Sequence, residues 1–389
     1  MMNMEPILKQ LPVFVDELRA IKETIISNIL LIGQTPAPTF EEAHRAEIFL
    51  ERLSDAQADI CATDDYNNPI GIIKGSSGGA KPPIFVVAHL DTFIAGDVDH
   101  NYVIRKNSIT GPGVLDNSAS VGVLASLPTI FQKLGISFES DIVLAGVTQS
   151  IGRGNLQGIR HLVKNWEGPI RGAVIMEAEK LGRLNYYSEG IIRGEIDCKI
   201  TAADNWAQRH KPNAILILNE VINEILAMEL PQRPRSRVII GKIDGGFKHG
   251  EIAFDARLGF EIQSDSDAMV KQMYSEIKDI VDGTSHEHNV ALKLNVISTL
   301  NASTLKYRHP LVKSAVAVMK RLGITPVSES SESELSIFLA NQIPAVTLGL
   351  TDGKNMHLGH ASMKIEPLFS GLSQVLGVIR AIDEGVCDE

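Results

Sequence analysis

Four short runs of this sequence are apolar at nearly every position rather than at every second one. They are residues 84–89 (IFVVAH), 141–148 (DIVLAGVT), 172–179 (GAVIMEAE) and 344–350 (PAVTLGL). Strands of this composition are buried on both faces, as in parallel sheets covered by helices on either side. Apolar residues at helical spacing fill the segments 120–134, 155–166 and 309–323. This alternation predicts an α/β domain with a doubly wound sheet.

The pattern changes between residues 193 and 302. There the segments read strand, helix, two strands, helix, strand, which predicts an inserted α+β domain with a four-stranded sheet. The first domain then comprises residues 1–192 and 303–389. Two domains also suit a chain of 389 residues, which is too long for one ordinary core.

The overall charge and composition limit the partners of the chain. A formal charge of −10 and a pI near 5.6 argue against nucleic acid or an anionic membrane, so a small molecule or a peptide is expected. We find no apolar run of the roughly 18 residues that a membrane span requires, and no signal peptide at the start. The widely spaced Cys61, Cys198 and Cys387 indicate reduced thiols, and a cytoplasmic protein is expected.

Polar residues that could bind a metal follow the predicted strands. His89 and Asp91 end one strand, and Glu177 lies at the end of another. Asp116 and His357 lie in loops. Because ligand sites of open α/β sheets lie at the carboxyl ends of the strands, these side chains can meet there. Imidazole and carboxylate groups together suit zinc, cobalt or manganese.

Alternatives remain open for these positions. Glu179 competes with Glu177, and His360 competes with His357. For His89 and Asp116 the alternative is a polar loop whose side chains are satisfied by backbone groups.

Three local patterns predict ordinary structure. Thr39 and Glu42 have the spacing of a helix capping box. The segment 75–80 (GSSGGA) resembles a flexible hairpin turn between two strands. The acidic run 328–334 (SESSESE) is typical of a solvated loop or helix cap.

Over nearly its whole length the chain resembles the dinuclear zinc exopeptidases of the aminoacylase, tripeptidase and carboxypeptidase type. The resemblance is carried by residues 31–53, 86–93, 111–127, 240–270 and 343–372. It implies a doubly wound mixed sheet of the phosphorylase/hydrolase-like kind with an inserted α+β lid domain that also forms a homodimer. It further implies one or two ions of zinc, cobalt or manganese, and a small peptide or N-acyl amino acid as ligand.

The resemblance also implies roles for single residues. His89, Asp116 and Glu177 would hold one metal. Asp116 would bridge to a second metal that His357 also holds, and Asp91 would orient the ring of His89.

The sequence departs from that family after the strand 141–148. Where the family has two adjacent glutamates, a general base and a metal ligand, this chain has Gln149 and Ser150. A register shift by one gives Ser150 and Ile151, so no alignment restores a carboxylate. A neutral amide cannot accept a proton from water, and loss of a general base typically costs about 10²–10⁴-fold in rate.

Three positions of the predicted lid depart as well. The lid histidine of the family falls at or near Trp206, its lid asparagine at Gly250, and its substrate-binding arginine at Gln263. A glutamine cannot replace a bidentate guanidinium. One loss could be repaired by a neighbour, for which the candidates are His210, His249 and His360.

Two hypotheses follow from these residues. The first is a metal-dependent exopeptidase or deacylase of weak activity with an altered base. The second is a catalytically silent relative that binds a peptide or a partner.

Overall fold

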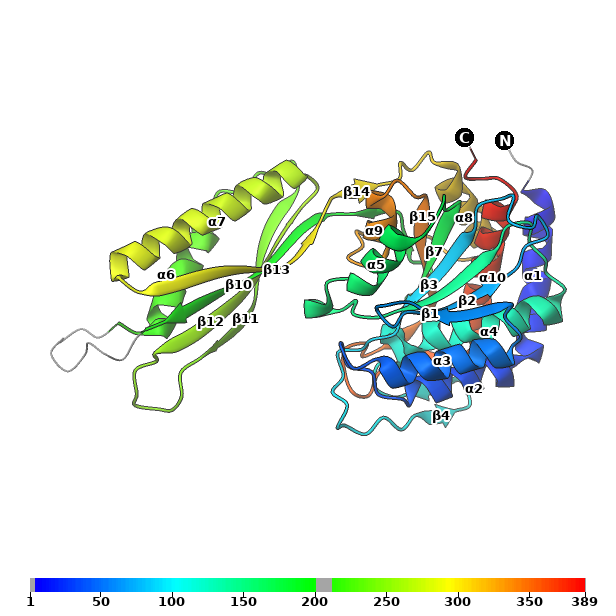
Figure 1. The fold of residues 1–389 in the computed structure, drawn as a ribbon, viewed down its shortest axis with the longest axis horizontal. Coiled ribbons are helices and arrows are strands. Elements are labelled where there is room, and N and C mark those ends of the chain that lie inside the picture. The colour runs from blue at the N-terminus through cyan, green and yellow to red at the C-terminus, as the bar shows by residue number, and fades with distance from the viewer. Residues whose placement is uncertain (1–3, 201–211, 389) are drawn as a thin grey trace. The chain divides into compact units, whose positions relative to one another are not determined.

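The computed structural model describes residues 4–200 and 212–388. The chain divides into two compact units, Met1–Tyr187 with Thr304–Glu389 and Ser188–Ser303 (Figure 1). The sequence placed the first boundary after residue 192, but strand β10 already begins at Gly190. The boundary therefore lies before this strand and does not cut it. Two short strands, β9 (Tyr187–Ser188) and β14 (Ser303–Thr304), pair where the chain passes from one unit to the other.

The first unit contains a seven-stranded sheet of order β1-β2-β6-β3-β7-β15-β8. Its strands are β1 (Ile60–Thr63), β2 (Pro69–Ile73), β3 (Ile84–His89), β6 (Ile142–Val147), β7 (Gly172–Glu179), β8 (Leu184–Asn185) and β15 (Ala345–Thr351). Strands β6, β3, β7 and β15 are parallel, and β1, β2 and β8 run antiparallel to their neighbours. The doubly wound mixed sheet is confirmed. The predicted hairpin at 75–80 is wrong, because β2 and β3 lie on opposite sides of β6.

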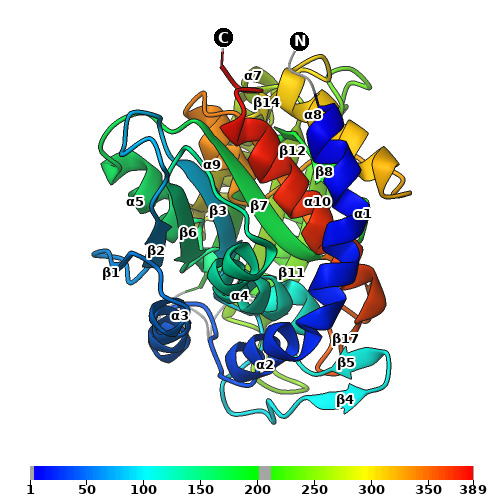
Figure 2. The same ribbon diagram turned by 90° about the vertical axis from the view of Figure 1, so that its right-hand side faces the viewer.

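Helices cover both faces of this sheet (Figure 2). They are α1 (Glu5–Ala20), α2 (Lys22–Gly33), α3 (Ala43–Asp55), α4 (Ala119–Leu134), α5 (Gln157–Asn165), α8 (Pro310–Arg321), α9 (Leu335–Ala340) and α10 (Glu366–Asp383). Strand β3 shows why its whole run is apolar: Val86 joins the core that includes α4 and α10, whereas Phe85 packs against Phe338 of α9. Successive side chains of a strand point to opposite faces, so both faces need apolar residues.

One segment differs from the expectation about membranes. Among the described residues, Val114–Leu134 is long and apolar enough by length and composition to cross a bilayer. However, 89% of its most apolar window is buried inside the protein. The segment is the central core helix α4 with the turn before it, and such helices pass the same test.

A small four-stranded sheet of order β16-β17-β5-β4 supports the loops that follow the main sheet. Its strands are β4 (Val103–Arg105), β5 (Ser108–Thr110), β16 (Gly353–Lys354) and β17 (Ser362–Lys364). Strand β5 leads into the turn η1 (Val114–Ser118), and β16 and β17 carry the loop between them. Because β17 pairs with β5, the loops that carry Asp116 and His357 are held near each other.

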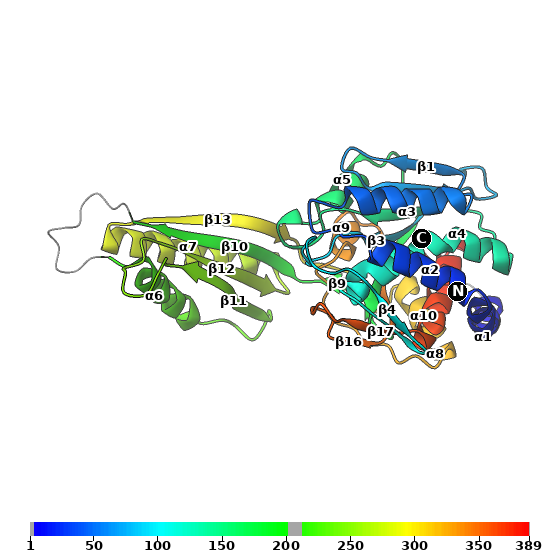
Figure 3. The same ribbon diagram turned by 90° about the horizontal axis from the view of Figure 1, so that it is seen from below.

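The second unit is the predicted α+β domain. It contains β10 (Gly190–Lys199), α6 (Ala214–Ala227), β11 (Ser236–Gly245), β12 (Asp255–Ser264), α7 (Asp267–His288) and β13 (Ala291–Leu300). The strands form an antiparallel sheet of order β11-β12-β10-β13, with α6 and α7 side by side on one face (Figure 3). Val221 of α6 and Ile277 of α7 pack with Leu258 and Phe260 of β12 in its core.

Candidate metal centre

Three of the predicted ligands meet at the carboxyl edge of the main sheet. His89 ends β3, Glu177 lies near the end of β7, and Asp116 projects from η1. One ligand atom from each lies within 4.8 Å of the others. Within residues 4–200 and 212–388 this is the one group of three or more His, Cys, Asp or Glu side chains so arranged. The mixed nitrogen and oxygen set fits a cation such as zinc, cobalt or manganese.

The ring of His89 is held with one nitrogen directed into this cluster. Nδ1 lies 3.0 Å from the backbone oxygen of Asp91 and 3.5 Å from Asp91 Oδ1, and Nε2 lies 3.3 Å from Asp116 Oδ1. Burial lowers the pKa of His89, but the bonds to Asp116 and Asp91 outweigh it and hold that pKa well above its usual value. Nε2 is the ring nitrogen that faces Asp116, and an orienting role of Asp91 stays a prediction.

Asn117 fixes the turn that carries Asp116. Its side-chain Nδ2 donates to the backbone oxygen of Met176 at 2.9 Å, and its Oδ1 accepts from the N–H of Ala178 at 3.0 Å. These two bonds flank Glu177 on β7, so they place Asp116 and Glu177 together. The Asp116–Asn117 peptide bond is cis.

Glu177 is the more deeply buried of the two carboxylates in the cluster. Burial raises its pKa to about 7; the charges of Glu334 and Asp116 act in the same direction, whereas those of His89 and Arg183 oppose them. A carboxylate in this position is destabilised unless a cation lies beside it. The alternative Glu179 instead pairs with Arg183 at 3.2 Å and lies outside the cluster.

His357 lies at the rim of the centre. Its Nδ1 is 3.9 Å from Asp116 Oδ2, its side chain is 71% exposed, and its ring packs against Phe93. His360 is exposed on the same loop, with no such pairing to Asp116. The structure therefore places His357, rather than His360, beside the oxygen that would bridge to a second ion. Its role as a ligand stays a prediction.

The turn at Gln149–Ile151 is surrounded by carboxylates from other parts of the chain. Glu42 accepts the N–H of Gln149 at 2.8 Å. Asp91 Oδ2 accepts the N–H groups of Ser150 and Ile151 at 3.0 and 2.8 Å. With Gln149 and Ser150 at these positions, the backbone N–H groups of all three turn residues are hydrogen-bonded.

The predicted capping box at the start of α3 is wrong. Glu42 is the N-cap residue, yet no side chain caps this helix. The hydroxyl of Thr39 donates to Asp91 at 2.8 Å, and Glu42 holds Gln149. Contacts distant in sequence have displaced the local ones, as is common at functional sites.

Arg45 supports the centre although the sequence analysis did not identify it. It is fully buried and donates to the backbone oxygens of Thr35 and Leu90, at 2.9 and 2.8 Å, and to Ser118 Oγ at 3.1 Å. These bonds fasten the end of β3 to η1. Burial lowers its pKa to about 10. Its spacing of four from buried Phe49 on α3 was the available signal.

The acidic run 328–334 contains a second missed residue. Glu334 is the N-cap residue of α9, one of the two predictions for this run, but it is only 1% exposed, so the alternative of a solvated loop is wrong there. Its Oε1 accepts the Ser150 hydroxyl at 2.6 Å. Packing of α9 against the sheet buries this residue, which charge patterning cannot reveal.

The predicted substrate-binding positions of the lid fall in the second unit. Trp206 and the candidate His210 lie outside the described residues. Gln263 is buried in β12, where its amide bonds to Arg237 and Glu261. His249 is exposed. A substrate role for Trp206 or Gln263 stays a prediction.

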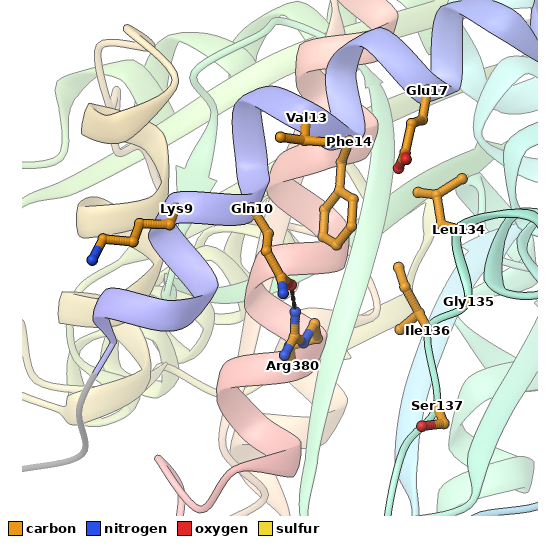
Figure 4. A pocket seen from close by; sticks show the side chains of 10 residues that line it. All are labelled: Lys9, Gln10, Val13, Phe14, Glu17, Leu134, Gly135, Ile136, Ser137 and Arg380. Carbon is orange, nitrogen blue, oxygen red and sulfur yellow. Dashed lines mark hydrogen bonds between the residues drawn. The ribbon is translucent and has the colours of Figure 1, made fainter.

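A pocket of about 410 Å³ lies elsewhere in the first unit (Figure 4). It is formed by α1, α10 and the segment that leads from α4 toward the amino end of β6, and Arg380 donates to Gln10 across it. The metal-ligand group lies at the opposite, carboxyl ends of the strands. This pocket is therefore separate from the candidate metal centre.

No protein-family profile and no curated protein matches the sequence. Solved structures match it in fold. A dipeptidase from Saccharomyces cerevisiae superposes with a TM-score of 0.78 at 14% identity, covering 98% of this chain and 99% of that one. A tripeptidase from Staphylococcus aureus gives 0.73 at 18%, covering 93% and 98%. An M20 family metallo-carboxypeptidase from Sulfolobus solfataricus gives 0.75 at 10%, covering 92% and 99%. The chain has the fold of these peptidases.

Proposed function

We propose that this protein is a metal-dependent hydrolase of an amide bond in a small peptide or N-acyl amino acid. The observation that carries the proposal is the convergence of His89, Asp116 and Glu177 within 4.8 Å at the carboxyl edge of the sheet. These residues would hold one cation, zinc, cobalt or manganese, and Asp116 with His357 would hold a second. A bound cation would polarise the substrate carbonyl and acidify water.

The substrate class is supported by the relatives in fold. They are a dipeptidase, a tripeptidase and a metallo-carboxypeptidase. The net charge of −10 adds no preference for nucleic acid or an anionic membrane.

A second candidate function is peptide or partner binding without turnover. The observation in its favour is Gln149, which offers no proton acceptor at the position of the family base. The two candidates predict the same cleft and the same metal, but they differ in whether ligand is hydrolysed.

A homodimer formed through the second unit, and a cytoplasmic location, belong to the proposal. Leu216 and Leu226 of α6 are exposed and would be available to such an interface. Light scattering during gel filtration would measure the mass in solution; a monomer would contradict the dimer.

The test begins with protein purified without chelator. Bound zinc, cobalt and manganese are measured in the wild type, in His89→Ala and in the surface control His44→Ala. We expect one or two ions in the wild type and control, and one ion fewer in His89→Ala. Hydrolysis of dipeptides and N-acetyl amino acids is then assayed after chelation and after return of each metal. Equal metal content in wild type and His89→Ala would contradict the proposed centre, and bound metal without hydrolysis would favour the silent relative.

A further inference from the structure

Glu334 is a buried acid that the metal centre described above does not use. One of its oxygens, Oε1, accepts the hydroxyl of Ser150 at 2.6 Å. The other, Oε2, is buried and has no hydrogen-bond partner. A buried carboxylate with an unsatisfied oxygen costs several kcal/mol unless something else compensates.

Helix capping does not account for this residue. Glu334 is the N-cap of α9, but its side chain makes no cap bond. Its charge also disfavours ionisation of Glu177, so it lies within electrostatic reach of the ligand cluster. Folding alone gives no reason for a second costly acid in this place.

The other two acids around the turn are occupied by backbone groups. Glu42 holds the N–H of Gln149, and Asp91 holds those of Ser150 and Ile151. Asp91 also accepts the Thr39 hydroxyl, whereas the side chain of Glu334 accepts, among the described residues, only the hydroxyl of Ser150. Ser150 is half-buried, whereas Glu334 is buried.

We propose that Ser150 and Glu334 form a proton relay that replaces the absent glutamate of the turn. The inference rests on the proposed hydrolase function and assigns it an acceptor. A short hydroxyl-to-carboxylate bond is the strong, charge-assisted kind along which a proton can pass.

The proton transfers through this relay account for the bonds formed and broken when an amide is hydrolysed. A water molecule gives one proton to Ser150 Oγ while the Ser150 hydroxyl proton passes to Glu334 Oε1. The water oxygen forms the new bond to the amide carbon. When the carbon–nitrogen bond breaks, the proton returns through Ser150 to the leaving nitrogen, and the products are a carboxylic acid and an amine.

The geometry separates this role from metal binding. Among the described residues, the group with all ligand atoms within 4.8 Å contains His89, Asp116 and Glu177 but not Glu334. Glu334 therefore lies outside that ligand group.

The test compares conservative and disabling variants at both positions. Glu334→Gln and Ser150→Ala remove the acceptor and the relay atom, whereas Glu334→Asp and Ser150→Thr retain a carboxylate and a hydroxyl. Glu329→Gln, an exposed acid of the same run that pairs with Lys180, is the control. Each variant is assayed for kcat and KM on the panel, for bound metal by mass spectrometry, and for thermal unfolding.

We expect Glu334→Gln and Ser150→Ala each to lower kcat by about 10²-fold with KM and metal content unchanged. The double variant should be no slower than either single variant, since both break one relay. The threonine and aspartate variants should retain most activity, and Glu329→Gln should stay within about twofold.

Three results would overturn the relay while leaving the proposed function intact. They are wild-type kcat in Glu334→Gln, loss of metal from Glu334→Gln, which would make Glu334 a ligand, and covalent labelling of Ser150 by a fluorophosphonate, which would make it a nucleophile. A wild type that hydrolyses nothing in the panel overturns the proposed function and the relay together.

Discussion

The ligand cluster and the turn beside it hold their charged groups in different ways. In the cluster, the side chains of His89, Asp116 and Glu177 point at a common position, and their mutual charges are unbalanced without a cation. In the turn, the carboxylates of Glu42 and Asp91 accept hydrogen bonds from the backbone N–H groups of residues 149–151. Any residue except proline can donate such bonds. The side chains of residues 149–151 can therefore vary without loss of these turn bonds, whereas the cluster depends on its side chains.

Loss of Asp116 is expected to have the largest effect, because this residue belongs to both proposed metal positions. Asp116→Ala should lose all bound metal and at least about 10³-fold in kcat/KM, or roughly 4 kcal/mol. His357→Ala should lose only the second ion. Metal content by mass spectrometry distinguishes the two variants, and equal losses would show that the positions are not separable.

The two side-chain hydrogen bonds of Asn117 join η1 to β7, so the loss of this side chain should destabilise the fold. Asn117→Ala leaves Met176 oxygen and the Ala178 N–H buried without partners, at a cost of about 3 kcal/mol in the free energy of unfolding. Metal affinity should fall as well. Urea unfolding measures the change in the free energy of unfolding, with the exposed Asn101→Ala as the control. A cost under about 1 kcal/mol would show that the two hydrogen bonds of Asn117 are dispensable.

Glu177 should oppose stability in the metal-free protein. Its folded pKa of about 7 lies above the ordinary 4.5, so the folded state binds the proton more tightly. The wild type therefore loses stability as pH rises from about 4.5 to 7. Glu177→Gln, which cannot ionise, should be more stable than the wild type by about 2 kcal/mol at pH 8, with no difference at pH 4.

The comparison requires the free energy of unfolding of the wild type and of Glu177→Gln, measured in chelator at pH 4 and at pH 8. Added zinc should reverse the order at pH 8, because only the wild type binds it. A variant that is less stable than the chelated wild type at pH 8 would contradict the unbalanced charge assigned to the cluster.

The fold and the positions of two cluster residues were predictable because they follow from local composition. Runs such as IFVVAH are apolar on both faces only when the strand is covered twice, and the carboxyl ends of such strands converge. His89 and Glu177 could therefore be placed together from their positions at strand ends. Asp116 was placed by family resemblance, and β17 pairing with β5 explains how its loop is held.

The remaining parts of the site could not be predicted, because contacts distant in sequence decide them. Thr39 and Glu42 carry a genuine local capping signal, but Asp91 and Gln149 bind them instead. Glu334 stands in a run whose charge pattern is that of a solvent-exposed segment, and only the packing of α9 buries it. The burial of such charged residues depends on contacts within the folded site and not on the neighbouring sequence.

The smallest expected effect is a rescue that joins the two regions. Gln149 lies on the turn with φ of 53°, half-buried and held through its backbone N–H, so its side chain can change without loss of that bond. In the Glu334→Gln background, Gln149→Glu should restore about tenfold in kcat, because a carboxylate on the turn accepts the proton of water directly. Gln149→Leu in the same background is the matched control and should restore nothing. Equal recovery with leucine would mean that packing at the turn, and not a proton acceptor, limits the rate.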